Sequence, residues 1–234
     1  ERMLQYFGAD IAYAGKYTKL KPRSWSIPAP IYVPGDISSA AFFIVATLIL
    51  KDSHTIMRDI GMNPTRSYFI EILKKMGGKI ITKNQRIINN EPIADIETFS
   101  SNLSSIEIDK DKAPGIIDEI PILCVASTVA KGKTVIRGAE ELRYKESDRI
   151  RAIVSQFKKL KVNIEEKEDG MVIEGDVNFR AGEGIVDSFG DHRIAMSLYI
   201  LGLLSIGKVT ILNSECIDTS FPGFKYNLKK VLAP

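Results

Sequence analysis

The chain has 234 residues, of which 44% are hydrophobic and 26% charged, and its formal net charge at pH 7 is +3. This length and balance are typical of a globular protein with one large or two unequal domains. The charge is too mild to indicate nucleic-acid binding. The basic cluster of Lys16, Lys19, Lys21 and Arg23 also lacks the interleaved aromatic residues of a single-strand binder, so we interpret it as a solvated loop.

The sequence also argues against a membrane protein and against a metalloprotein. The longest apolar runs, residues 40–50 and 196–206, are shorter than the roughly 20 residues that a membrane span needs. No signal peptide or lipidation motif is visible. Cys124 and Cys216 stand in no metal or redox spacing. The sequence therefore predicts a protein of the reducing cytoplasm without a bound metal.

The first 33 residues differ in pattern from the rest. Residues 3–11 match the ends of two later amphipathic helices, where each helix leads into a strand. We interpret residues 1–33 as the tail of the last repeat of another, incomplete domain. Prolines from Pro28 to Pro34 mark the crossing into the main domain, residues 34–234.

The main domain repeats at a period of roughly 75 to 80 residues, in units of about 34–90, 104–176 and 184–234. Each unit has an acid, an almost wholly apolar helix, a β-branched strand and an amphipathic helix. The acids and apolar helices are Asp36 with 38–50, Asp118 with 120–129 and Asp191 with 194–206; the strands are 55–58, 134–137 and 209–212. Hairpins are expected to close the first two units, 79–82 with 86–88 and 162–165 with 171–174.

A helix that is apolar on every side belongs inside a core. The repeats therefore predict an α/β (α+β) fold of βαβαββ-type units, with parallel helices buried and sheets outside. The helix N-termini would meet at one end, bringing together Asp36, Asp118 and Asp191, and their dipoles would attract a phosphorylated or carboxylated ligand. Ser38 and Ser39 are candidates either for hydroxyl donors to that ligand or for helix caps.

The segment Arg143-Tyr-Lys-Glu-Ser-Asp-Arg149 packs two acids and three bases into seven residues after an apolar strand. Apolar residues then recur at helical spacing from Ile150 to Leu160, so the charges lie at a helix N-terminus. Lys145 could hold an anion while Glu146 moves a proton. A solvated charged turn that caps the helix is the alternative.

Four motifs carry a family resemblance: Asp118-Glu-Ile-Pro121, the segment from Arg143 to Arg149, Asp191-His-Arg193 and Thr219-Ser-Phe-Pro222. In this order and spacing they resemble the EPSP synthases (3-phosphoshikimate 1-carboxyvinyltransferases) among the enolpyruvyl transferases. The resemblance implies a monomer of two domains. Each domain would be an inverted α/β barrel of three units, with the active site between them.

The family reaction transfers the enolpyruvyl group of phosphoenolpyruvate to the 5-hydroxyl of shikimate 3-phosphate and releases phosphate. By resemblance, Asp118 is the carboxylate at the sugar hydroxyl and Glu146 the proton carrier at the methylene carbon. Lys145 would contact the substrate oxygens and share in the proton transfer, as a third catalytic residue. Arg149 and Arg193 would clamp the carboxylate of phosphoenolpyruvate.

His192 would support that clamp, or it is a capping or core histidine. The reaction needs no metal or organic cofactor, because phosphate is already the leaving group. Glyphosate, the family's inhibitor, is a candidate ligand.

Two positions depart from the family pattern. Thr219 stands where better-known members carry a lysine that contacts phosphate, and Glu141 stands where many have an asparagine. The family's N-terminal substrate-binding residues have no counterpart in this chain, so we expect the chain alone to show no measurable turnover.

Two alternatives remain at this point. UDP-N-acetylglucosamine enolpyruvyl transferase has the same architecture but lacks the Lys-Glu-Ser-Asp-Arg segment. A non-catalytic anion-binding module would keep the helix N-termini but would not need Asp118 and Glu146 together.

Overall fold

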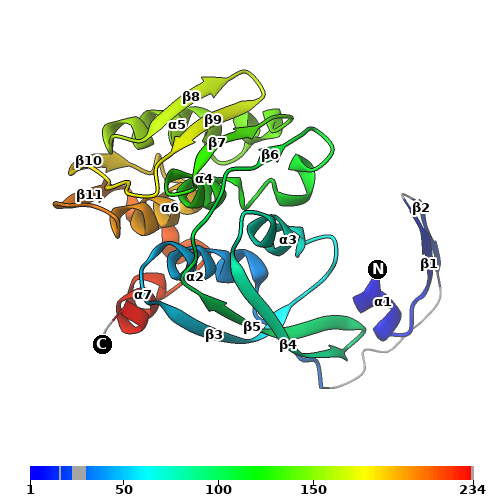
Figure 1. Cartoon of the computed structure of the whole chain (residues 1–234). Helices are drawn as coiled ribbons and strands as arrows, with labels where there is room; N and C mark the ends of the chain where they lie inside the picture. Colours follow the sequence, from blue (N-terminus) through cyan, green and yellow to red (C-terminus); the bar gives the residue numbers. More distant parts are fainter. Residues whose placement is uncertain (16, 23–29, 233–234) are drawn as a thin grey trace.

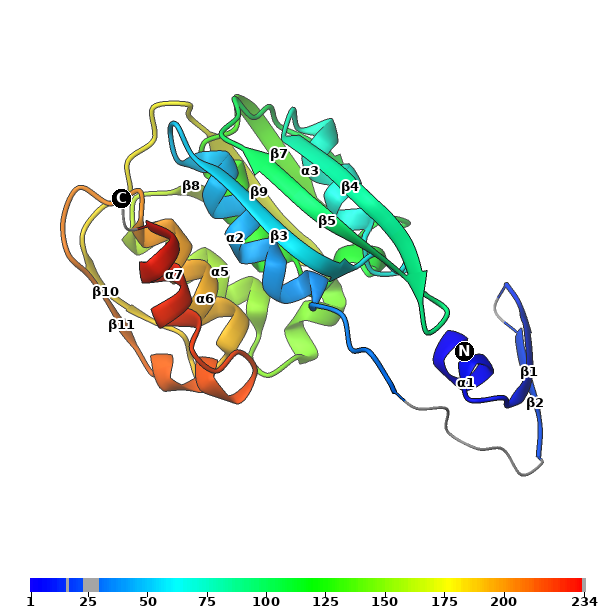
Figure 2. The ribbon, with the colours of Figure 1, turned by 90° about the horizontal axis from the view of Figure 1, so that it is seen from below.

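The computed structural model describes residues 1–15, 17–22 and 30–232. At the N-terminus, α1 (Arg2–Tyr6) leads into β1 (Asp10–Ala14), which pairs antiparallel with β2 (Tyr17–Lys21). The predicted passage from helix to strand is therefore confirmed. Figures 1 and 2 show this segment beside the main body rather than within it. Lys16, Arg23 and Pro28, which entered the predictions above, lie outside the described residues.

Three apolar helices form the centre of the main body: α2 (Ile37–Ile49), α4 (Ile120–Thr128) and α6 (His192–Gly202). Each contacts the other two, and Figure 1 shows them in the interior with the sheets around them. All nine residues of α4 are buried. The arrangement of buried helices with sheets outside is confirmed, and the fold is an inverted α/β barrel.

Three sheets surround these helices. The first contains β3 (His54–Gly61), β5 (Glu91–Phe99) and β4 (Lys79–Ile88) in that order, all antiparallel; the second contains β6 (Glu107–Ile108), β7 (Gly132–Ile136), β9 (Gly170–Gly175) and β8 (Asn163–Lys167); the third pairs β10 (Gly184–Asp187) with β11 (Val209–Leu212) in parallel. The second sheet has one parallel pair, β6 with β7. The hairpin predicted for the second unit is confirmed as β8 and β9, with Asn163 opposite Glu174.

The hairpin predicted for the first unit is wrong. Residues 79–82 and 86–88 both belong to β4, which pairs along its length with β5. Asn84, with φ 50°, sits where the register shifts and imitates a turn signal. The turn itself is made by Asn89 and Asn90, both with positive φ, as a two-residue hairpin loop requires. The first sheet therefore extends to Phe99, beyond the predicted limit at residue 90.

Amphipathic helices complete the body: α3 (Tyr68–Lys75), α5 (Arg149–Lys159) and α7 (Phe224–Leu232). Their apolar faces are buried, at Phe69, Phe157 and Phe224 among others. Short 3₁₀ turns, η1 (Ala113–Ile116), η2 (Glu140–Tyr144) and η3 (Ser214–Thr219), join the larger elements.

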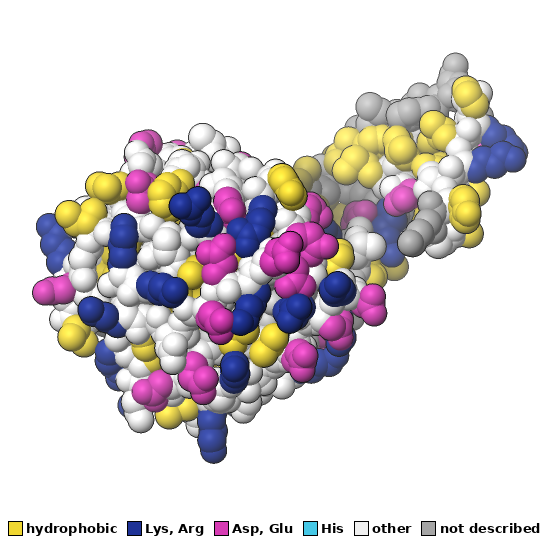
Figure 3. Space-filling model, turned by 90° about the horizontal axis from the view of Figure 1, so that it is seen from above, with side chains coloured by type: hydrophobic (Ala, Val, Ile, Leu, Met, Phe, Trp, Pro, Cys, Tyr) yellow, Lys and Arg dark blue, Asp and Glu magenta, His cyan; other side chains and the backbone are white. Residues whose placement is uncertain are grey.

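The surface seen in Figure 3 mixes basic and acidic side chains without separating them. In the described part of the chain, no helix combines the length and the apolar character that crossing a bilayer requires. The same residues contain no group of three or more His, Cys, Asp or Glu side chains placed to hold a metal ion.

Candidate functional site

The first turns of α2, α4 and α6 lie at the same end of the barrel, where the side chains of Ser38, Glu119 and Arg193 meet. Asp36 caps α2 by accepting from the N–H groups of Ser38 and Ser39, and Asp191 caps α6 in the same way. That these helix N-termini attract a phosphorylated or carboxylated ligand stays a prediction, and Asp36, rather than Ser38 or Ser39, is the cap of α2. The N–H groups at the start of α2 and α6 already have a carboxylate, so the positive charge for a ligand comes from side chains.

Arg149 is the centre of the charged cluster. It is the first residue of α5, whose N-cap is Asp148, and its side chain is 1% exposed. Its Nε donates to Asp191 Oδ2 at 2.8 Å and its Nη2 to Glu146 Oε2 at 2.6 Å, while Nη1 lies 3.4 Å from Asp118 Oδ1. A buried cation needs such partners. Arg149, Glu146 and Asp118 therefore lie together as predicted, with the Arg149 guanidinium between the two carboxyl groups.

Arg193 approaches the same carboxylate from α6. Its Nη1 donates to the backbone oxygen of Asp118 at 3.0 Å, and its Nη2 lies 3.6 Å from Asp118 Oδ2. Nη1 is also 3.7 Å from Glu119 Oε1. The guanidinium of Arg193 therefore holds the start of α4 as well as facing the Asp118 side chain.

Two members of the cluster were not among the predicted site residues. Glu119 is 3% exposed and accepts a hydrogen bond from Ser38 Oγ at 2.5 Å. Arg66 donates from Nη2 to Ser38 Oγ at 2.7 Å, and its Nη1 lies 3.6 Å from Asp118 Oδ2. Glu119 could have been suspected, since it follows Asp118 directly. Arg66 lies in the turn between β3 and α3, where no pattern distinguishes it from a solvated arginine.

The pKa values of the neighbouring Asp118 and Glu119 are shifted in opposite directions. Burial alone would raise the pKa of Asp118, but Arg193, Lys145, Arg149 and Arg66 together outweigh it and lower this pKa. Burial raises the pKa of Glu119, and its bond from Ser38 and the nearby arginines offset this only in part. Carboxyl groups whose pKa values are driven apart are typical of acid–base sites.

The remaining predicted site residues differ in how closely they contact the cluster around Arg149. Lys145 donates from Nζ to Glu141, and its charge also acts on Asp118. His192 Nδ1 lies 3.9 Å from Glu146 Oε1, and burial lowers the pKa of this imidazole, which favours its neutral form. Thr219 is exposed and donates to the backbone oxygen of Cys216 at 2.7 Å within η3. Its hydroxyl is thus engaged in its own turn.

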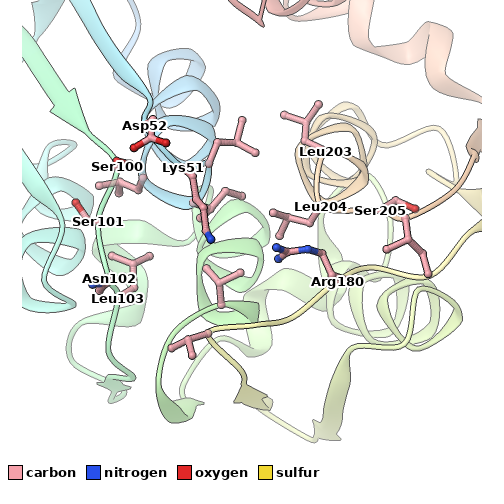
Figure 4. A pocket seen from close by; sticks show the side chains of 16 residues that line it. Lys51, Asp52, Ser100, Ser101, Asn102, Leu103, Arg180, Leu203, Leu204 and Ser205 are labelled. Atoms are coloured by element: carbon pink, nitrogen blue, oxygen red, sulfur yellow. The ribbon is translucent and has the colours of Figure 1, made fainter.

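A hollow of about 600 Å³ lies at the opposite end of the barrel, where the three central helices finish. Figure 4 shows the side chains of Lys51 and Arg180 pointing into it from two sides. Cations at helix C-termini complement the negative end of the helix dipoles. This hollow lacks the paired carboxyl groups of the first site, so we place the candidate site at the helix N-termini.

Comparisons with known proteins show the family of this chain. The family model described as EPSP synthase (3-phosphoshikimate 1-carboxyvinyltransferase) matches residues 1–228. A 3-phosphoshikimate 1-carboxyvinyltransferase of Endomicrobium trichonymphae is 50% identical over 96% of this chain and 52% of its own length. One from Petrotoga mobilis is 48% identical over 99% of this chain and 54% of its own length. The chain therefore spans about half the length of the curated relatives it matches.

Solved structures show the same correspondence. An EPSP synthase structure from Acinetobacter baumannii is 41% identical and superposes with a TM-score of 0.94, covering 98% of this chain and 53% of that one. The enolpyruvyl transferase NikO from Streptomyces tendae, at 19% identity and a TM-score of 0.73 over 99% of this chain and 52% of its own, shares the fold. The chain belongs to the EPSP synthase family.

Proposed function

We propose that this chain supplies one wall of the active site of a 3-phosphoshikimate 1-carboxyvinyltransferase. The reaction joins the enolpyruvyl group of phosphoenolpyruvate to the 5-hydroxyl of shikimate 3-phosphate and releases phosphate. The observation that carries the proposal is the buried Arg149, which gathers Asp118, Glu146 and Asp191 around one guanidinium. A further set of substrate-binding groups would have to come from the part of the relatives that this chain does not match.

Asp118 is suited to act as a base. Its lowered pKa keeps it ionised near neutral pH, so it can accept the proton of the attacking hydroxyl. Glu146 is suited to carry a proton to and from the methylene carbon, because its carboxyl group is half exposed and only one of its oxygens is bound by Arg149. Lys145, beside both, would balance the charge of the substrate oxygens.

The carboxylate of phosphoenolpyruvate would bind at the arginines. Arg149 has its η nitrogens on Glu146 and Asp118, so an incoming carboxylate would take the place of one of these contacts. If Glu146 is the group displaced, its carboxyl group is freed from Arg149 and can turn toward the bound substrate. Arg193 would form the second arm of the clamp, and the neutral His192 would pack beside it.

Membership of the EPSP synthase family supports further proposals about the cleft, the inhibitor and the oligomeric state. Thr219 and Glu141 would lie at the rim of the cleft, where Glu141 already holds Lys145. Glyphosate is proposed as an inhibitor, and the full-length protein as a monomer. A cytoplasmic location suits its two free thiols, Cys124 and Cys216. UDP-N-acetylglucosamine enolpyruvyl transferase is the less favoured activity, because relatives that are 50% and 48% identical are named 3-phosphoshikimate 1-carboxyvinyltransferase.

The proposal is tested in a chimera in which this chain replaces the matched 52% of the Endomicrobium trichonymphae relative. Phosphate release with both substrates is compared for the chimera, for Glu146→Gln and for Glu165→Gln. Glu165 is a matched control, because it is exposed on β8 and paired with Lys167. We expect Glu146→Gln to lose about 10²- to 10⁴-fold in kcat, as loss of a general acid–base group does, and Glu165→Gln to be unchanged.

Equal activity of Glu146→Gln and the unsubstituted chimera would contradict the proton-carrier role. A folded chimera that binds phosphoenolpyruvate but never releases phosphate would favour the non-catalytic anion-binding module. The 234-residue chain alone is expected to release no measurable phosphate.

A further inference from the structure

Arg66 contacts the candidate site although it belongs to none of the four family motifs. It lies in the turn after β3, and its side chain is 46% exposed. One nitrogen, Nη2, donates to Ser38 Oγ at 2.7 Å on the first turn of α2. The other, Nη1, lies 3.6 Å from Asp118 Oδ2 just before α4. The two nitrogens thus connect two central helices at their N-terminal ends.

We propose that Arg66 is a positioning residue for Asp118, with Ser38 as the anchor that fixes its guanidinium. This inference rests on the proposed role of Asp118 as the base. Ser38 is held in turn, because its hydroxyl donates to the buried Glu119. The contacts from Glu119 through Ser38 to Arg66 hold the guanidinium with Nη1 toward the Asp118 carboxylate.

The environment of Asp118 shows what Arg66 adds. Oδ2 lies 3.6 Å from both Arg66 and Arg193, and Oδ1 lies 3.4 Å from Arg149. Arg149 and Arg193 also contact other carboxyl groups, and Nη2 of Arg66 lies 3.8 Å from Glu119 Oε1, so the cations and carboxyl groups form one shared network. The remaining titratable groups around the pair are Lys145, Glu119, Glu146, Asp191 and His192.

The charge and the geometry of Arg66 make separable contributions. Loss of the charge removes one of the four cations that keep Asp118 ionised, so the pKa of Asp118 rises. Lysine keeps the charge but lacks the planar guanidinium, so it cannot present separate nitrogens to Ser38 and to Asp118 in the geometry of Arg66. Ser38→Ala keeps Arg66 whole but removes its anchor.

The test is a carbon-detected NMR titration of the side-chain carboxyl groups of the 234-residue chain, with Asp118 assigned from an Asp118→Asn spectrum. Because it needs no turnover, it is independent of whether the proposed function holds. Arg58→Gln is the matched control, since Arg58 is an exposed arginine on β3 and the change in net charge is identical.

We expect the pKa of Asp118 to rise most in Arg66→Gln, less in Arg66→Lys and Ser38→Ala, and not at all in Arg58→Gln. Equal titration of Asp118 in Arg66→Gln and Arg58→Gln would overturn the proposal. If Arg66→Gln fails to fold, an unchanged titration in both Arg66→Lys and Ser38→Ala would overturn it as well.

Discussion

Replacing Arg149 by methionine should cost far more stability than its position in a charged surface segment implies. The side chain is 1% exposed, and Asp191, its partner at 2.8 Å, is completely buried. Methionine fills a similar length but leaves the Asp191 carboxylate in the interior without a cation. Breaking a buried ion pair from one side costs about 3 to 5 kcal/mol. For a chain of this size that corresponds to a fall in Tm of about 6 to 20 °C.

The control is Arg143→Met in the same seven-residue segment. Arg143 pairs with Asp148 and Glu166, but all three side chains are partly exposed, at 23%, 34% and 39%. Arg143 also donates to the backbone oxygens of Lys167 and Glu168, but solvent screens its ion pairs and its loss leaves no fully buried charge, so the cost should be clearly smaller than for Arg149→Met. Urea unfolding followed by circular dichroism measures both variants. If Arg149→Met is no more destabilised than Arg143→Met, the view of Arg149 as the structural centre of the site is refuted.

Two further predictions concern the buried groups. Because the pKa of Glu119 is raised in the folded protein, ionisation of Glu119 opposes folding. The free energy of unfolding therefore falls as pH rises above the ordinary pKa of 4.5. Glu119→Gln lacks that ionisation, and its stability relative to the unsubstituted chain should therefore improve between about pH 4 and 7; a difference that is constant across this range would contradict the burial argument. Burial also raises the pKa of both thiols, most strongly for Cys124, which has no exposed surface. An aromatic disulfide reagent should label Cys216 slowly in the folded chain and Cys124 only after unfolding, and rapid labelling of folded Cys216→Ser would show that the α4 core is open.

The periodic elements of this fold could be predicted from the sequence, and the elements that depend on pairing could not. The three buried helices and the start of α5 at Arg149 follow from local composition. β5 has six consecutive buried residues and a proline, so it shows no alternation that would mark it as a strand. β6 and β10 are short and exist through parallel partners distant in sequence.

The candidate site divides in the same way. Asp118, Glu146 and Arg149 stand in dense charged motifs, and the structure brings them into contact. Arg66 contributes to the same site from a turn that carries no signal, because its role comes from contacts with Ser38 and Asp118, which are distant from it in sequence. The sequence also left open whether Ser38 and Ser39 cap α2, and the structure shows that Asp36 does. A helix N-terminus attracts a carboxylate equally from the protein or from a ligand.

The central claim is that the arginine–carboxylate cluster at the helix N-termini serves enolpyruvyl transfer to shikimate 3-phosphate. Its most direct test is to incubate the chimera with phosphoenolpyruvate and shikimate 3-phosphate and identify the products by NMR. We expect equal amounts of phosphate and of an enolpyruvyl ether at the 5-hydroxyl. Phosphate without that ether, or an ether formed only on UDP-N-acetylglucosamine, would contradict it.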